Sequence, residues 1–237
     1  MLALLTLVCV VTYSFEIVFG LAGTILMLMV MSFFLDAKTL VVYSLLPQIL
    51  VGVIGLARSP KTVSVAYLAR MLGFAALGGF GGLYLFDIFS ERAFHYLLAA
   101  AISGSGIYLA LSPARLRMRT PAAHALDTLA GASQALFGIS APLAMTRLLG
   151  TFDDKTVVRN YALAFSLSMN VFRGVGYLGT GTINGSIVHM MLVSLPFLAV
   201  TLWFANQLHF RVNDRLFRRV VAWVILLGGA TMFLNAP

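Results

Sequence analysis

The sequence contains few charged residues for its length. Of its 237 residues, 16 are Lys or Arg and 8 are Asp or Glu, together 10% of the chain. A soluble domain carries about 25% charged residues, whereas this chain is 60% apolar. So few charges cannot cover a water-soluble surface. This excludes a soluble enzyme, a nucleic-acid-binding domain and a disordered tail.

Cysteine is also nearly absent. The single cysteine, Cys9, lies in an apolar run, cannot form an internal disulfide and indicates no metal site. No histidine has a metal-ligand spacing with another His, Asp or Glu, so we expect neither a metal nor a cofactor. The chain also lacks a Walker-type phosphate loop, so it cannot itself hydrolyse ATP.

Charged and turn residues divide the remaining sequence into apolar segments. The net charge of +8 indicates cytoplasmic loops that orient a membrane protein. A spanning helix needs about 20 residues, and the N-terminal run has no basic region typical of a signal peptide. The expected segments are 2–35, 39–57, 62–86, 93–111, 122–149, 156–178, 186–208 and 216–235.

The two halves of the chain resemble each other. Phe19-Gly20 matches Phe137-Gly138 at an offset of 118, and the same offset pairs Glu16 with Gln134. Internal repeats are common in secondary transporters. The sequence therefore predicts a first membrane repeat at 1–112, an Arg-rich cytoplasmic linker at 113–121 and a second membrane repeat at 122–237.

The first segment of each repeat decides the predicted topology. A straight helix over residues 2–35 would be about 51 Å long, against a hydrocarbon core of about 30 Å. A break near residues 15–23, and another within 122–149, would give hairpins that enter and leave on one side. With these hairpins, the only basic loop residues on the outer side are Lys38 and Arg92. Eight full crossings would distribute the basic residues more evenly, so the hairpin topology fits the positive-inside rule better.

This topology leaves three crossings in each repeat, and an odd number inverts the second repeat relative to the first. We therefore expect an all-α integral membrane protein with two inverted repeats of four segments. The first segment of each repeat would be a broken or re-entrant helix hairpin, with both termini outside and the linker inside. The alternative is a long tilted first helix and two parallel repeats.

The hairpin tips, 15–24 and 133–142, are the first candidates for a binding site. Two helix N-termini that meet near mid-membrane present free N–H groups, and such groups bind anions. The alternative is that the tip glycines only permit close helix packing. The substrate-binding candidates at the tips are Gly20, Ala22, Gly23, Thr24, Gln134, Gly138, Ser140 and Ala141.

Polar residues inside the segments add further candidates. Arg173 shares a helical face with Asn170 and Ser166, and Arg173 and Asn170 are substrate-binding candidates because a charge within a span indicates function. Alternatively, Arg173 reaches the interface or pairs with Glu16. Glu16 is the only acid placed well inside an apolar run and is a proton-coupling candidate; the alternative is an ion pair or a tip hydrogen bond. Gln48 is a weak sign of a cavity.

The tip motifs resemble a known family. Residues 131–142, Gly-Ala-Ser-Gln-Ala-Leu-Phe-Gly-Ile-Ser-Ala-Pro, resemble the second-repeat signature of the TauE/SafE sulfite-exporter family. Arg159-Asn160 and Arg173 with Tyr177-Leu178-Gly179 resemble its continuation. Residues 19–23 resemble the first-repeat signature, without its Gly-Gly-Gly run and proline. The resemblance implies an inner-membrane permease that exports sulfite, sulfoacetate or other organosulfonates.

Together these patterns predict a secondary transporter of a small sulfur-containing anion such as sulfite, working by alternating access, and not an enzyme. An intramembrane hydrolase is disfavoured because Ser133 and Ser140 are expected at a different depth from His189. The alternatives left open are a membrane-embedded substrate-binding subunit that works with a separate ATPase, and a transporter of a different small anion. The expected partners are the anion and the lipid bilayer, with a homodimer left open and nucleic acid excluded. The expected location is the cell inner membrane, as a multi-pass protein.

Overall fold

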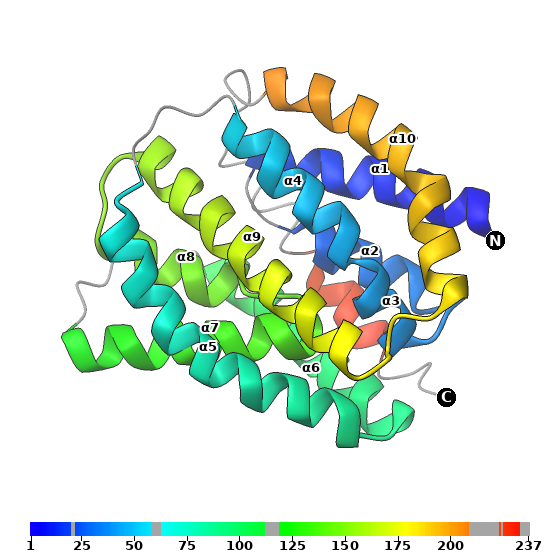
Figure 1. Ribbon diagram of the computed structural model, residues 1–237, viewed down its shortest axis with the longest axis horizontal. Helices are drawn as coiled ribbons and strands as arrows, with labels where there is room; N and C mark the ends of the chain where they lie inside the picture. The colour runs from blue at the N-terminus through cyan, green and yellow to red at the C-terminus, as the bar shows by residue number, and fades with distance from the viewer. Residues whose placement is uncertain (20–21, 58–62, 112–118, 209–222, 224, 233–237) are drawn as a thin grey trace. The chain divides into compact units, whose positions relative to one another are not determined.

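The computed structural model describes residues 1–19, 22–57, 63–111, 119–208, 223 and 225–232, and these are helical with no strand (Figure 1). The prediction of an all-α protein is therefore confirmed for this part of the chain. The helices are α1 (Leu2–Phe19), α2 (Gly23–Met31), α3 (Ala37–Tyr43), α4 (Leu45–Ala57), α5 (Val65–Ile88), α6 (Glu91–Leu111), α7 (Thr120–Phe137), α8 (Ala141–Leu149), α9 (Lys155–Gly179) and α10 (Gly185–Leu208).

The helix bounds follow the expected apolar segments. Within the described residues, Ala37–Ala57, Val65–Ile88 and Gly185–Gln207 are long and apolar enough to cross a membrane by length and composition. These stretches correspond to the segments expected at 39–57, 62–86 and 186–208. Most of the segment expected at 216–235, and most of the linker at 113–121, lie outside the described residues.

Both segments expected to be broken consist of two helices. α1 ends before the first break and α2 begins after it, at Gly23; α7 and α8 are separated by residues 138–140. Ala22 has a φ of 79° and Gly138 a φ of 70°. Gly138 directly follows α7, where its positive φ turns the chain out of the helix without the steric cost of a Cβ atom, whereas Ala22 adopts a positive φ as the N-cap of α2. The breaks are confirmed; entry and exit on one side of a membrane stays a prediction.

The segment expected at 39–57 is interrupted between α3 and α4. Pro47 has no N–H to donate to the carbonyl of Tyr43, so the helical hydrogen-bond pattern fails at this point. Asp36 begins α3 as its N-cap, and its carboxylate accepts a 2.7 Å hydrogen bond from the backbone N–H of Thr39. Asp154 begins α9 in the same way.

The chain forms two compact units, and each unit takes helices from both halves of the sequence. Unit 1 contains Met1–Pro47, Phe89–Pro113 and Ile183–Pro237, and unit 2 contains Gln48–Ile88 and Ala114–Thr182. In unit 1, α1 packs against α2 and α10, and α3 contacts α2, α6 and α10. In unit 2, α5 lies along α7 and contacts α9, and α8 contacts α7 and α9 (Figure 1). The two compact units, which are defined by packing, therefore do not coincide with the two predicted repeats, which are defined by similarity of sequence.

Glycine allows α5 and α7 to approach each other backbone to backbone. A Cβ atom on Gly78 would overlap the carbonyl of Thr128, and one on Gly131 would overlap that of Ala75. Small residues permit this approach in membrane helices, where van der Waals packing drives helix association. Gly81 lies on α5 as well, but a Cβ atom there would meet nothing within 4 Å.

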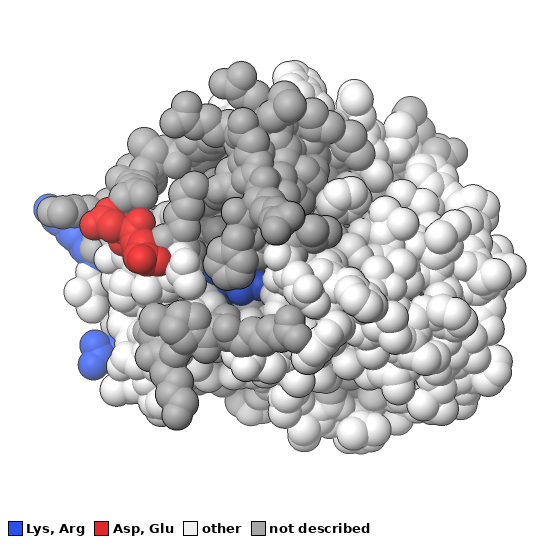
Figure 2. Space-filling view, turned by 90° about the horizontal axis from the view of Figure 1, so that it is seen from above, with Lys and Arg blue, Asp and Glu red and all other residues white. Residues whose placement is uncertain are grey.

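The surface of several helices carries large apolar side chains. Leu77 on α5, Leu178 on α9 and Phe204 on α10 are 66%, 69% and 63% exposed. Figure 2 shows one face on which Lys, Arg, Asp and Glu side chains are few. An exposed surface this apolar fits contact with lipid, as expected of a multi-pass membrane protein.

The contact between α5 and α7 predicts the effect of adding one methyl group. We expect Gly78→Ala to lower the free energy of unfolding by about 1–3 kcal/mol, because the new Cβ atom forces the helices apart. Thermal unfolding in detergent measures the change. Gly81→Ala is the matched control and should leave the midpoint unchanged or raise it, since alanine favours helix. Equal midpoints for the two variants would contradict the packing described here.

Candidate functional site

Three amide side chains form a hydrogen-bonded cluster in unit 2. Gln134 donates from Nε2 to Gln48 Oε1 at 2.7 Å and to Asn170 Oδ1 at 3.1 Å. Asn170 donates from Nδ2 to Gln48 Oε1 at 3.0 Å and to Ser166 Oγ at 3.3 Å. Gln48, Gln134 and Asn170 are 3%, 1% and 0% exposed. Buried amides remain stable only when hydrogen-bonded, and here they satisfy one another.

The cluster lies at the break between α7 and α8. Gln134 is in the last turn of α7, Gln48 comes from α4 and Asn170 from the middle of α9. The amide of Gln48 donates to the carbonyl of Gly138 at 3.2 Å, and the Ser133 hydroxyl donates to the carbonyl of Ile139. These carbonyls lie past the end of α7, so side chains take the place of helical partners.

Arg173 is fully buried beside this cluster. Its NH1 donates to the carbonyl of Gln134 at 3.2 Å, and its Cζ lies 5.8 Å from the centre of the Tyr177 ring. The Tyr177 hydroxyl donates to the carbonyl of Ala135 at 3.2 Å. A cation at the carbonyl end of a helix is favoured by the helix dipole. The guanidinium therefore stabilises the end of α7 and does not extend to the surface.

The N-terminus of α8 begins on the other side of the same break. Ser140 is its N-cap, Ala141 its first residue, and Pro142 falls in the first turn, where a missing N–H costs nothing. The Ser140 side chain makes no capping hydrogen bond. Its φ of -117° and ψ of -15° are not the extended values of a capping serine, so capping by this hydroxyl is not observed.

The first break, in unit 1, is organised by an acid. Both the backbone N–H and the hydroxyl of Thr24 donate to Glu16 Oε2, at 2.7 and 2.9 Å. Glu16 thus caps α2, a task that the side chain of Ala22 cannot perform. A Cβ atom on Gly23 would lie 2.5 Å from the Glu16 Cβ and from the Thr12 carbonyl. The tip hydrogen bond expected as one alternative is therefore present, and proton coupling at Glu16 stays a prediction.

The predicted site residues thus fall into two groups. The group in unit 2 consists of Gln134, Gly138, Asn170 and Arg173, with Ser140 and Ala141 at the same break. The group in unit 1 lies around Glu16 and consists of Ala22, Gly23 and Thr24. Gly20 lies outside the described residues. Gln48 was given little weight from the sequence. Ser133 was included in the second tip and Tyr177 in the family resemblance, and neither was named as a binding residue. A lone amide after proline in an apolar segment was the only signal for Gln48.

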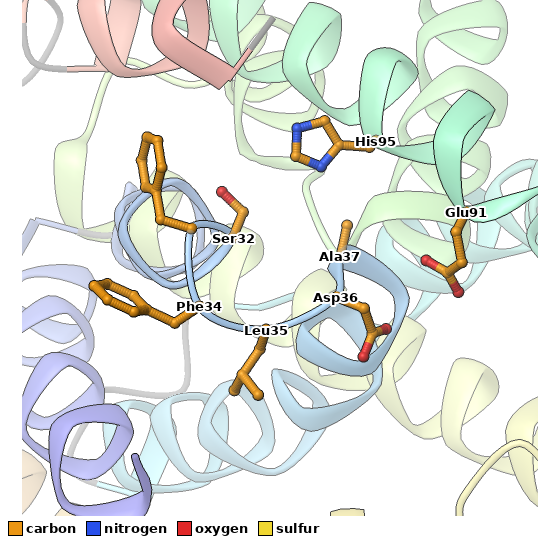
Figure 3. Close-up of a pocket in the computed structure, with 8 residues that line it drawn as sticks. Ser32, Phe34, Leu35, Asp36, Ala37, Glu91 and His95 are labelled. Carbon is orange, nitrogen blue, oxygen red and sulfur yellow. The ribbon is translucent and has the colours of Figure 1, made fainter. Parts of the chain in front are cut away.

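Unit 1 contains a separate cavity of about 610 Å³ where α2 ends and where α3 and α6 begin. Figure 3 shows His95 and Glu91 projecting from α6 and Asp36 from the turn before α3. His95 Nε2 lies 3.0 Å from the carbonyl oxygen of Met232. Partial desolvation at the edge of this cavity raises the pKa of the Glu91 carboxyl, the Asp36 charge raises it further, and Lys38 lowers it.

Comparison with known proteins identifies a family. The family model described as Sulfite exporter TauE/SafE matches residues 5–232, which is nearly the whole chain. The match includes both helix breaks and the part of α9 that carries Asn170 and Arg173. No curated protein and no solved structure matches.

The raised pKa of Glu91 predicts how stability depends on pH. Because folding favours the protonated form, the ionised carboxylate destabilises the fold, and stability falls as pH rises from the ordinary pKa to the raised one. At a pH above this range, we expect Glu91→Gln to have a higher unfolding midpoint than the wild type. At a pH below this range, the midpoints of the two proteins should be equal. Thermal unfolding from acidic to mildly basic pH measures this. Asp87→Asn, at the end of α5, is the control; the same gain at every pH would contradict the assignment.

Proposed function

The chain belongs to the sulfite exporter TauE/SafE family, and from this premise we propose that it carries a small sulfur-containing anion outward across the cell inner membrane. The family consists of membrane permeases, so the chain is a permease and not an enzyme. Sulfite and organosulfonates are the proposed substrates. The observation that carries this proposal is the buried Arg173 beside three amides at a break between two helices.

The chemistry of this site suits a tetrahedral or pyramidal oxyanion. A guanidinium offers several N–H donors in a planar fork, which matches two oxygens of a sulfonate. Gln48, Gln134 and Asn170 carry further N–H donors, and each amide can turn its N–H group toward a ligand. The first N–H groups of α8, at Ser140 and Ala141, add the positive end of a helix dipole. We propose that the anion binds among these groups, all of which belong to unit 2.

The first helix break is proposed to act differently. Ala22, Gly23 and Thr24 surround the start of α2, but the carboxylate of Glu16 already accepts the N–H and hydroxyl of Thr24. An anion at this terminus would be repelled by that carboxylate. We propose that Thr24 binds substrate only after Glu16 has moved away or taken up a proton.

Alternating access through inverted repeats remains part of the proposal. The packing of the two breaks supports it: α1, before the first break, packs against α10, and α7, before the second, packs against α5. α5 and α10 are the third segments of the first and second repeats. Each broken segment therefore packs against the third segment of the opposite repeat, which is the arrangement that a pair of related repeats would produce.

A ligand panel on the purified protein tests the substrate class. Sulfite, sulfate, thiosulfate, taurine, isethionate and sulfoacetate are added in turn while thermal unfolding is recorded. A ligand at about 100 times its dissociation constant should stabilise the folded state by about 2.7 kcal/mol. We expect a sulfur anion to raise the unfolding midpoint of the wild type, and Arg173→Lys to weaken this shift because lysine lacks the fork.

Two further variants make this test specific. Arg92→Ala, which removes an exposed cation at the start of α6, should keep the full ligand shift. Arg173→Ala should lose the shift; if it fails to fold, Arg173→Lys decides the result. A shift that persists in both Arg173 variants would move the anion away from this side chain. Acetate is added as a carboxylate control, and if it stabilises the protein while no sulfur anion does, the proposed substrate class is wrong.

A further inference from the structure

A polar cavity of about 150 Å³ in unit 2 lies between the N-terminal turns of α5 and α7 and the last turn of α8. The charged and titratable groups that line it are Tyr67 and Arg70 from α5, His124 and Asp127 from α7, and Arg147 from α8. Within the described residues, α9 contributes none. None of the residues that line this cavity belongs to the amide cluster or is Arg173, so the proposed substrate site does not use the cavity.

Asp127 is the unusual member of this group because it is almost completely buried. It is 1% exposed, whereas the sequence pattern had singled out Glu16 as the acid well inside an apolar run. Among the described residues neither carboxylate oxygen has a hydrogen-bond partner. Arg147 Nε lies 3.6 Å from Oδ1 and His124 Nδ1 lies 3.8 Å from Oδ2, both beyond hydrogen-bond length. A buried carboxylate held this loosely is costly unless a charge or a proton neutralises it.

The neighbouring helices hold both cationic partners in place. The Phe74 ring on α5 stacks on the His124 ring at 4.0 Å with an interplanar angle of 16°. Arg147 donates from NH1 to the Thr151 hydroxyl, and its Cζ lies 5.3 Å from the centre of the Tyr67 ring. Both groups keep these contacts while they lie 3.8 and 3.6 Å from the Asp127 carboxylate oxygens. Among the described residues, the Arg147 guanidinium is the fixed positive charge paired with this carboxylate, since histidine is cationic only when protonated.

We propose that Asp127 is a proton-binding site and that a small anion entering its cavity is bound together with one proton. The anion pairs with Arg147 and Arg70. The positive charge of Arg147 then neutralises the anion and no longer neutralises the Asp127 carboxylate. A proton from solvent then binds the carboxylate and forms the neutral acid. One negative charge enters and one is neutralised, so the net charge of the cavity is unchanged. This coupling rests on the proposed anion transport, but it names a different site and a second transported species.

Proton uptake on anion binding tests the proposal directly. Two monoanions that do not titrate near neutral pH, isethionate and methanesulfonate, are added in turn to the purified full-length protein in weak buffer containing a pH indicator. We expect the wild type to take up about one proton for each anion bound. Over the pH range in which this uptake occurs, its affinity for the anion should fall about tenfold for each unit of rising pH. Asp127→Asn should bind the anion without uptake and without this pH dependence.

Matched variants separate the possible results. Asp87→Asn, an exposed acid at the end of α5, should keep the wild-type uptake, and Asp127→Glu should keep uptake with a shifted pH range if Asp127→Asn fails to fold. Uptake that is lost in Glu16→Gln and retained in Asp127→Asn would overturn the proposal in favour of Glu16. Anion binding without uptake in the wild type would overturn it and leave the proposed transport intact. If neither anion binds at any pH, both proposals fail for these probes.

Discussion

The break between α7 and α8 imposes the constraint on which the rest of unit 2 depends. A helix that ends inside an apolar environment leaves carbonyl oxygens without helical partners, and lipid supplies no substitute. Buried side chains act on this end: Tyr177 donates to the carbonyl of Ala135 and Gln48 to that of Gly138. Arg173 adds a second donor to the carbonyl of Gln134, which also accepts the backbone N–H of Gly138. These side chains come from α4 and α9, so the break fixes the positions of two other helices. The polar groups proposed to meet the substrate are thus also the groups that make the break possible.

The two breaks of the chain are stabilised by opposite means. At the second, donors from Arg173 and Gln48 act on the carbonyl end of α7; at the first, the acceptor Glu16 acts on the N–H end of α2. The residues paired at an offset of 118, Glu16 and Gln134, therefore have different tasks. Gln134 is neutral and turns toward Gln48 and Asn170, which leaves the start of α8 without an internal anion. This difference explains why we place the substrate in unit 2.

The sequence predicted the breaks better than it predicted the site. Glycines, a proline and a segment too long for one straight crossing are local signals, and both breaks occur where they indicated. The partners of Gln134 are not local: Gln48 lies 86 residues away, and Gln48 also meets Asn170 from 122 residues away. Such contacts depend on how helices pack. Asp127 was missed because its short distance from the start of an apolar segment suggested the interface, whereas α5 and α8 enclose it.

Pro47 has a consequence for how the permease could move. The chain passes between the two compact units at four points, and the first, between Pro47 and Gln48, falls within the stretch Ala37–Ala57 that is long enough to cross a membrane. The other three fall outside the stretches identified as spanning. The stretch Ala37–Ala57 therefore contributes residues to both units, and Pro47 removes a backbone hydrogen bond near its centre. Bending at Pro47 costs less than bending an intact helix, and the residue that follows the proline is Gln48, a member of the amide cluster.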